Sequence, residues 1–209
     1  MKNVSYICRM DESLKKIIQT AETLYYKYGI KSVTMDDVAR ECMISKKTLY
    51  KYVNDKIDLL RQVLSFEFSK HRTLFNAVSE KGLNAVEEVV QIHNILIEML
   101  KNHNTVIEYD MLKYYPAVHR ELSERKSEYI LKMMKINLQK GIDEGLYHSD
   151  INIDLVAKQR VIFQVQKVEN SVVSYKEFLK PEAVKQMLLY HMRAVCTPKG
   201  LKLYNEKMK

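Results

Sequence analysis

Residues 34–56 read T-M-D-D-V-A-R-E-C-M-I-S-K-K-T-L-Y-K-Y-V-N-D-K, and this stretch decides the fold. It predicts two short helices joined by a tight turn, followed by the start of a third helix. Thr34 is expected to cap the first short helix, with Asp37 three residues later completing an acidic variant of the capping box. Ser45 is expected to cap the second short helix. Two short helices joined in this way are typical of a helix-turn-helix, which places its second helix in the major groove of DNA.

The sequence on either side of this stretch also has helical spacing. Before it, apolar residues recur at positions 14, 17, 18, 21, 24, 25 and 28, which gives one helix a single apolar face. Gly29 follows at the place of a C-terminal helix stop. After it, Asn54 or Asp55 is expected to cap a longer helix with apolar residues at 57, 60, 64 and 68.

The composition favours helices throughout the chain. Only five glycines and three prolines interrupt 209 residues, and so few breakers favour long helices over many short strands. Five further helices are expected, over residues 84–101, 105–115, 117–144, 154–173 and 181–196. Residues 199–209 are expected to form a short, mobile basic tail. We therefore predict an all-α fold with about nine helices. The predicted division is a helix-turn-helix domain over residues 1–54, a connecting helix over 55–82 and a helical domain over 83–209.

The charge and the cysteine content of the chain limit its possible binding partners and its cellular compartment. The net charge of +8 suits a polyanionic partner, and residues 45–56 carry four lysines against one aspartate. Charges interrupt the longest apolar stretches, so no membrane span is expected, and residues 1–9 lack the apolar run of a secretion signal. Cys8, Cys42 and Cys196 lie far apart without metal-ligand spacing. They are expected to be reduced thiols in a cytoplasmic protein.

Over residues 14–64 the sequence resembles the DNA-binding domain of TetR-family transcriptional regulators. The family pattern runs from an apolar first helix and a glycine, through a threonine-started helix, to Ser-x-x-Thr-Leu-Tyr-x-(His/Tyr)-(Phe/Val) and a lysine. The matching residues of this chain are Gly29, Thr34, Val38, Ala39, Ser45, Thr48, Leu49, Tyr50, Tyr52, Val53 and Lys56. The resemblance covers about a quarter of the chain. It implies an N-terminal three-helix DNA-binding domain followed by a C-terminal helical domain for ligand binding and dimerisation.

Two positions depart from the family pattern. Met43 stands where the family usually has a glycine in the turn, so its backbone is expected either to accept a positive φ or to shift the turn. Lys47 stands where the family often has a glycine just before the threonine of the recognition helix. This substitution adds a long cation at the groove-facing end, so the operator sequence of relatives cannot be transferred to this chain.

The motif and the resemblance together predict the DNA contacts. The expected set is Thr34, Ser45, Lys46, Lys47, Thr48, Tyr50, Lys51, Tyr52 and Lys56. Lys46, Lys47 and Thr48 are expected to read base edges, because lysine donates to guanine, and threonine hydrogen-bonds a base or packs on thymine. Four others match family positions that contact phosphates, and Lys51 lies on the same face. Without the ordered motif, the lysines would be read as a solvated helix face.

The resemblance also implies a homodimer. Two C-terminal helices of this family pack against their two-fold mates as a four-helix bundle, and a two-fold dimer sets two recognition helices about 34–36 Å apart, as a palindromic site requires. Two apolar stripes permit this arrangement, although each also suits plain core. They are Val161, Val165, Val168 and Val172 on one helix, and Val184, Met187, Leu188, Met192 and Val195 on the other.

The remaining C-terminal helices of the family enclose a ligand pocket. The candidate lining residues are His93, Met99, His103, Tyr109, Met111, Tyr114, Met133 and Met134. Methionine adapts to irregular apolar ligands, and tyrosine or histidine can orient one polar group. Taken singly, each is more typical of core or surface. Glu108 and Asp110 favour a cationic ligand if they face the pocket, and carry no such meaning if they face solvent. His93 and His103 lack zinc spacing, so neither a metal nor a cofactor is predicted.

The sequence thus predicts a DNA-binding transcriptional regulator. The leading hypothesis is a dimeric repressor that holds a palindromic operator in double-stranded DNA and releases it when a small-molecule effector binds. An alternative keeps the DNA binding but places control with a protein partner, or dispenses with a ligand. A third hypothesis is a helical enzyme. The sequence shows no Gly-rich phosphate loop, Ser-His-Asp arrangement or CxxC motif that would support it, so no enzymatic activity is predicted.

Overall fold

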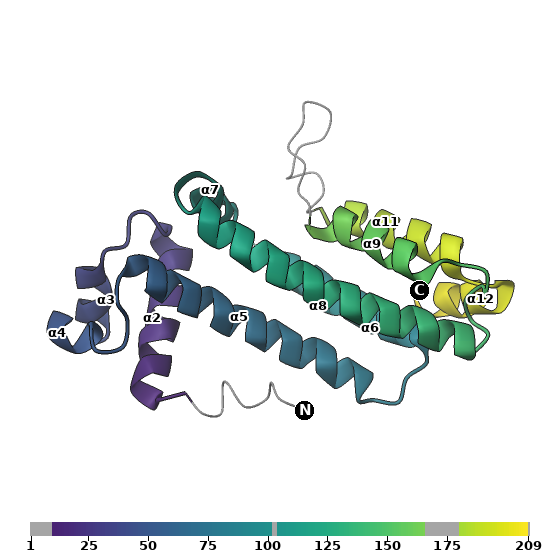
Figure 1. Cartoon of the computed structure of the whole chain (residues 1–209), viewed down its shortest axis with the longest axis horizontal. Helices are drawn as coiled ribbons and strands as arrows, with labels where there is room; N and C mark the ends of the chain where they lie inside the picture. Colours follow the sequence, from purple (N-terminus) through teal and green to yellow (C-terminus); the bar gives the residue numbers. More distant parts are fainter. Residues whose placement is uncertain (1–9, 102–103, 166–179, 209) are drawn as a thin grey trace. The chain divides into compact units, whose positions relative to one another are not determined.

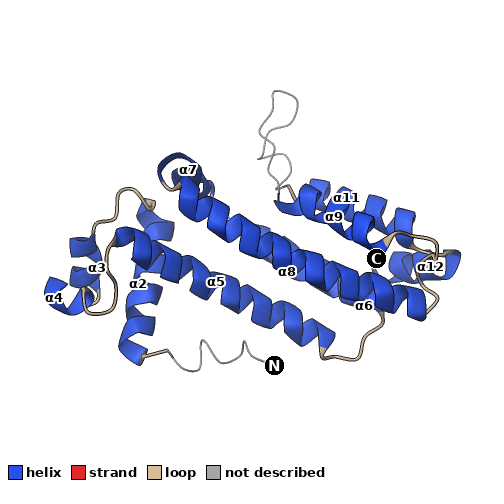
Figure 2. Ribbon diagram, in the orientation of Figure 1, coloured by secondary structure: helices blue, strands red, loops and turns tan. Residues whose placement is uncertain are grey.

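The computed structural model describes residues 10–101, 104–165 and 180–208, and within these ranges every regular element is an α-helix (Figures 1 and 2). The helices are α2 (Glu12–Tyr28), α3 (Met35–Glu41), α4 (Lys46–Leu49), α5 (Lys56–Ser79), α6 (Ala85–Lys101), α7 (Thr105–Tyr114), α8 (Pro116–Asp143), α9 (Ile153–Val165), α11 (Pro181–Val195) and α12 (Pro198–Lys207). The predicted all-α class is confirmed. The described residues form ten helices where about nine were expected. None of these helices is long and apolar enough to cross a membrane.

The chain forms two compact units that do not follow a single cut in the sequence. Unit 1 comprises Met1–Thr73 and Asn104–Leu122, and unit 2 comprises Leu74–His103 and Ser123–Lys209. Helices α5 and α8 therefore contribute residues to both units, and α7 belongs to unit 1 although it follows α6 of unit 2. The predicted boundaries at residues 54 and 82 remain a prediction.

Unit 1 is built on the apolar face of α2. Ile18 and Ala21 of this helix are fully buried, and they pack in one cluster with Leu49 of α4 and Leu59 of α5. Met111 of α7 is 3% exposed and belongs to the same cluster. Burying such side chains is worth about 1.5–3 kcal/mol each, so this shared core fixes the short helices that cannot be stable alone.

Unit 2 has a second apolar core formed by α6, α8, α9, α11 and α12. Val86, Leu138, Ala157 and Met192 are fully buried in it. Tyr147, in the loop after α8, is also buried there, and its backbone pairs with that of Cys196 just after α11. This pairing ties two connections that are far apart in the sequence.

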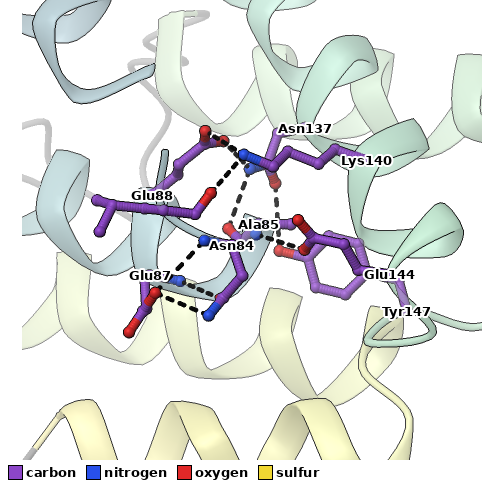
Figure 3. A network of polar contacts seen from close by, with 9 residues as sticks. Asn84, Ala85, Glu87, Glu88, Asn137, Lys140, Glu144 and Tyr147 are labelled. Atoms are coloured by element: carbon purple, nitrogen blue, oxygen red, sulfur yellow. Dashed lines mark hydrogen bonds and ion pairs between the residues drawn. The ribbon is translucent and has the colours of Figure 1, made fainter. Parts of the chain in front are cut away.

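A buried polar network lies inside unit 2, where α6 meets α8 (Figure 3). The Asn137 side chain donates to the Ala85 carbonyl and to the Glu88 carboxylate, each at 3.0 Å, and accepts from the Tyr147 hydroxyl at 3.1 Å. Glu88 also pairs with the Lys140 ammonium at 2.7 Å. Because the buried charges are paired and hydrogen-bonded, the network specifies one register of α6 on α8 without leaving unsatisfied groups.

The C-terminal end of the chain differs from the expected mobile tail. Residues 198–207 form α12, whose start is capped by Thr197 with Pro198 in the first turn. Tyr204 is 3% exposed in the core of unit 2, and Lys207 pairs with Glu87 at 2.7 Å. The expectation of mobility was wrong because the basic residues lie on the outer side of a helix whose inner side is apolar.

The later helices otherwise follow the predicted order. Helix α9 begins one residue before the expected start, and its described part ends at Val165, so the predicted extension to residue 173 lies outside the described residues. Helix α11 has Pro181 in its first turn as expected. Cys42 and Cys196 are buried free thiols, and Cys8 lies outside the described residues.

Candidate nucleic-acid interface

The turn between α3 and α4 depends on a residue in the left-handed region. Thr34 caps α3 and forms the expected capping box with Asp37. After α3 ends, Met43 adopts φ 57°, and its side chain is 90% exposed. Of the two expected outcomes at this position, a positive φ or a shifted turn, the structure shows the positive φ. The backbone of Met43 is therefore under conformational strain that a glycine at this position would not have.

Helix α4 is a single turn fixed at both ends. The Ser45 hydroxyl accepts a hydrogen bond from the Thr48 backbone N–H at 3.0 Å and lies 2.9 Å from the Thr48 hydroxyl. Leu49 is fully buried in the core of unit 1. Anchoring at Leu49 leaves the opposite side of α4 exposed, and the short capped helix therefore presents its polar face in a fixed orientation.

Four of the predicted DNA contacts lie on this exposed surface. Lys46, Lys47, Tyr50 and Lys51 are all exposed. The Lys46 ammonium pairs with Asp36 of α3 at 2.9 Å, an exposed ion pair that stabilises by about 0–1 kcal/mol and can readily exchange for a phosphate or a base. Lys47 and Lys51 form no hydrogen bond or ion pair with the described residues. Two cations to which the described residues offer no partner thus lie on the outer face of the motif.

Thr34 and Ser45 are also exposed, whereas Tyr52 and Lys56 are more closely held by the protein. The Lys56 ammonium donates to the Lys31 carbonyl at 3.0 Å and lies 6.0 Å from the centre of the Tyr115 ring. Partial burial lowers the pKa of Lys56, although Asp110 and Asp37 act in the opposite direction. Tyr52 is half-buried against the core of unit 1. These side chains support the motif, and their predicted phosphate contacts remain a prediction.

Helix α7 supports the turn that precedes the motif, which sequence reasoning missed. The Asp110 carboxylate, 6% exposed, accepts from the Lys31 backbone N–H at 2.8 Å. The Asn104 side chain donates to the Tyr26 carbonyl at 2.7 Å, and the Lys31 ammonium donates to the Tyr114 hydroxyl at 3.1 Å. Asp110 therefore holds the loop between α2 and α3, and neither of its expected roles, ligand contact or solvent exposure, describes its position.

The predicted pocket residues are divided between the two units. Tyr109, Met111 and Tyr114 belong to α7 in unit 1, with Met111 in the core and both tyrosines exposed. His93 is buried on α6 of unit 2, Met99 is half-buried on the same helix, and Met133 and Met134 are half-buried on α8. His103 lies outside the described residues. Among the described residues, one surface groove runs along α8 and another lies between α2 and α5, and none of the predicted pocket residues lines either of them.

The predicted dimer residues have three different environments. Leu188, Met192 and Val195 lie in the core of unit 2, each no more than 2% exposed, because α11 turns them toward α6 and α12. Val161, Val184 and Met187 are half-buried. Val168 and Val172 lie outside the described residues, as does the side chain of Val165. Large apolar side chains beside these positions are more accessible: Leu155 is 62% exposed, Ile162 is 48% exposed and Tyr190 is 70% exposed.

Comparison with known proteins agrees with this geometry. Residues 17–63, which span α2 to the first turns of α5, match the family described as bacterial regulatory proteins, tetR family. The HTH-type transcriptional repressor KstR2 of Mycobacterium tuberculosis is 23% identical over 152 residues, covering 68% of this chain and 72% of KstR2. The uncharacterised HTH-type regulator YuxN of Bacillus subtilis is 31% identical over 98 residues. That match covers 47% of this chain but only 34% of YuxN.

Solved structures share the fold along most of the chain. A transcriptional regulator from Cytophaga hutchinsonii superposes with a TM-score of 0.72 at 16% identity, covering 90% of this chain and 100% of that one. A TetR-family regulator from Streptomyces coelicolor has a TM-score of 0.66 at 17% identity, covering 92% and 93%. The helix-turn-helix geometry and the matched domain lead to one conclusion: residues 17–63 form a DNA-binding domain of the tetR family of bacterial regulatory proteins, within a helical fold that solved transcriptional regulators share.

Proposed function

We propose that the protein is a dimeric repressor that binds a palindromic operator and releases it when a small-molecule effector binds unit 2. The observation that carries the proposal is the exposed face of α4, where Lys47 and the neighbouring Lys51 have no partner within the described part of the chain, beside a capped turn. Unpaired cations on a fixed helix favour contact with a polyanion. The relative KstR2 is named as a repressor, which favours repression over activation.

In this proposal the two ends of the motif have different roles. Lys46, Lys47 and Thr48 read base edges, since the first residues of the second helix enter the major groove. Thr34, Ser45, Tyr50, Lys51, Tyr52 and Lys56 contact the phosphate backbone. Phosphate contacts fix the register of the protein on DNA but carry no sequence information, so sequence preference would come from the first three residues.

Dimerisation through α9 and α11 is supported by their exposed apolar side chains. Leu155 and Ile162 on α9 and Tyr190 on α11 are all about half exposed or more. Because Leu188, Met192 and Val195 are already buried inside unit 2, these exposed side chains, together with Val161, Val184 and Met187, form the proposed surface for the second copy. A two-fold dimer would present two copies of α4 to successive major grooves.

Control by a small molecule is supported by α7. This helix holds the α2–α3 loop through Asp110 and continues through Pro116 into α8, which itself extends into unit 2. An effector that favours one position of α8 would therefore bias the orientation of the motif, as a shift between two populations. One solved structure with this fold is named a γ-butyrolactone receptor, with a TM-score of 0.65 at 18% identity. The alternative, control by a protein partner or no ligand at all, shares the same DNA-binding surface.

The proposal is tested by titrating the full chain onto labelled duplexes and following fluorescence anisotropy as the salt concentration rises. One duplex carries the DNA upstream of the protein's own gene, and the other carries the same bases in shuffled order. The proposal predicts tighter binding to the upstream DNA at physiological salt and a steep fall in affinity as salt increases. Equal affinity for both duplexes at every salt concentration would refute it.

A further inference from the structure

A basic side chain lies inside the apolar part of unit 2. Arg160 on α9 is 8% exposed, and it follows the fully buried Ala157 by one helical turn. His93 on α6 is 5% exposed, and His191 on α11 is half-buried. Arg160 donates to the carbonyl of Met187, one turn before His191 on α11, and its positive charge lowers the pKa of both imidazoles, so the three basic groups come from three helices of one core. Of these three residues, only His93 is singled out from the sequence.

The guanidinium of Arg160 has no acidic partner among the described residues. Its hydrogen bond there goes to the Met187 carbonyl at 3.5 Å, at the long limit for such a bond. The acid nearest in sequence on the same helix, Asp154, pairs with Lys158 at 2.5 Å and also with Lys135. A guanidinium carries five N–H donors, and the described residues accept from only one nitrogen of Arg160.

The surroundings keep the two histidines neutral and the arginine charged. Burial, then Arg160 and Lys185, lower the pKa of His93, and burial followed by Arg160 lowers the pKa of His191 to about 4. Burial lowers the pKa of Arg160 to about 10, so the guanidinium stays protonated at neutral pH. The cluster therefore offers one buried cation and two neutral imidazoles that can each donate one hydrogen bond.

An isolated buried cation is costly, and proteins retain such a group where a binding partner compensates it. When no partner is bound, replacing such a charge by an apolar residue commonly leaves the protein equally stable or makes it more stable. A buried charge with this property is retained for function and not for stability. The network around Glu88 shows how unit 2 treats a structural charge, with a paired and hydrogen-bonded partner. Arg160 lacks such a partner in the described chain.

We infer that Arg160, with His93 and His191, binds the acidic group of an anionic small-molecule effector. This inference rests on the proposed function, since it names the chemical class of the molecule that releases the operator. The anion would accept two parallel hydrogen bonds from the guanidinium and one from an imidazole. Because Arg160 is buried beside the apolar core of unit 2, the body attached to that acid is expected to be apolar.

The inference is tested by isothermal titration calorimetry of the full chain with four eight-carbon probes. Octanoate and octyl phosphate carry an acid, whereas octanamide and 1-octanol have the same chain without a charge. We expect one or both acids to bind about tenfold or more tightly than the neutral probes, because charge-assisted hydrogen bonds are the stronger ones. The preferred acid distinguishes a carboxylate effector from a phosphate effector. Equal binding of acids and neutral probes, or binding of no probe, would overturn the inference without the need for any variant.

Two variants assign the binding to the cluster. Arg160→Met removes the charge at nearly constant volume, and Lys158→Met removes a charge from the exposed side of the same helix. We expect Arg160→Met to abolish the preference for acids. Without a probe, this variant should unfold at the same urea concentration as the wild type or at a higher one. We expect Lys158→Met to retain the preference for acids. A preference that survives Arg160→Met, or a lower unfolding midpoint for that variant, would show that the guanidinium is a structural group.

The DNA titration separates this inference from the proposed function. Preference for the upstream duplex together with no acid binding would remove the anionic effector but leave the regulator. Acid binding together with equal affinity for both duplexes would leave an anion site in a protein that is not a sequence-specific repressor.

Discussion

The Asp110 carboxylate on α7 accepts a hydrogen bond from the backbone N–H of Lys31, with 2.8 Å between the two atoms. Lys31 lies in the loop between α2 and α3, and Gly29 in the same loop approaches Asp110 so closely that an added Cβ would lie 3.1 Å from its Oδ2 atom. One buried carboxylate thus determines how the first helix of the domain leads into the helix-turn-helix.

Replacing Asp110 by alanine leaves the Lys31 N–H without its partner in a partly buried position. We expect the free energy of unfolding to fall by about 1–3 kcal/mol, measured by urea titration, with weaker binding to all DNA sequences alike. Glu121→Ala is the matched control, because it breaks an exposed ion pair with Arg61 and is expected to cost about 0–1 kcal/mol. An equal, small effect of both changes would show that Asp110 does not hold the loop.

Replacing Lys47 by alanine removes an exposed cation that pairs with none of the residues the structure describes. We expect little change in stability but altered preference among operator sequences, with a loss of about 1–3 kcal/mol at the base pair that Lys47 contacts. The control is Lys202→Ala, an exposed lysine of α12 in unit 2, which removes the same charge far along the chain. A uniform loss across all operator variants would place Lys47 on the phosphate backbone.

Met43 allows a direct measurement of the strain in the turn. Because its φ is 57° and its side chain is 90% exposed, Met43→Gly is expected to raise the free energy of unfolding by about 1 kcal/mol. Met43→Ala loses the same side chain beyond Cβ but keeps the strained conformation, so it should not gain stability. If alanine and glycine are equally stable, the methionine carries no backbone strain.

The stability of unit 2 should depend on pH through His191. Burial and the charge of Arg160 lower its pKa to about 4 in the folded protein, below the ordinary value of about 6.5. The contribution of neutral His191 to the free energy of unfolding is therefore fully present above about pH 6.5. As the pH falls toward 4, this contribution is lost, and the free energy of unfolding falls by on the order of 2 kcal/mol. Urea titrations at pH 7.5, 6 and 5 should show a loss that His191→Gln reduces and that the exposed His148→Gln leaves in place. Parallel curves for all three proteins would contradict this.

The docking of α12 depends on Gly200. A Cβ at this position would lie 2.1 Å from the backbone carbonyl oxygen of Leu146, so Gly200→Ala requires α12 to move. We expect a loss of about 1–3 kcal/mol and faster proteolysis after α11. Lys199→Ala, at an exposed neighbouring position, should change the stability by less than about 0.5 kcal/mol. A tolerated Gly200→Ala would mean that α12 is not held against this loop.

The sequence predicts local structure in this protein better than it predicts which surfaces meet. Thr34, Ser45 and Gly29 act where the pattern places them, because caps and stops depend on residues a few positions apart. Apolar spacing cannot say which helix covers a stripe. Leu188 and Met192 therefore read equally well as an interface or as core, and they are core within unit 2.

Helix α12 and the buried Arg160 each have a recognisable sequence pattern that the sequence predictions did not include. Thr197 followed by Pro198 is an N-cap with proline in the first turn, which predicts the start of α12. Arg160 recurs at helical spacing with Ile153 and Ala157, so a charge on the apolar face was visible in the sequence. Its lack of an acidic partner could come only from the structure, since partners of buried charges lie on other helices.

Selection of bound sequences from a random pool of duplex DNA, at physiological salt with the purified full chain, tests the central claim most directly. We expect a palindromic consensus whose half-sites lie about one helical turn or a multiple of it apart, as two copies of α4 in a two-fold dimer require. Recovery of no consensus would contradict it, because a sequence-specific dimeric regulator cannot bind all sequences alike.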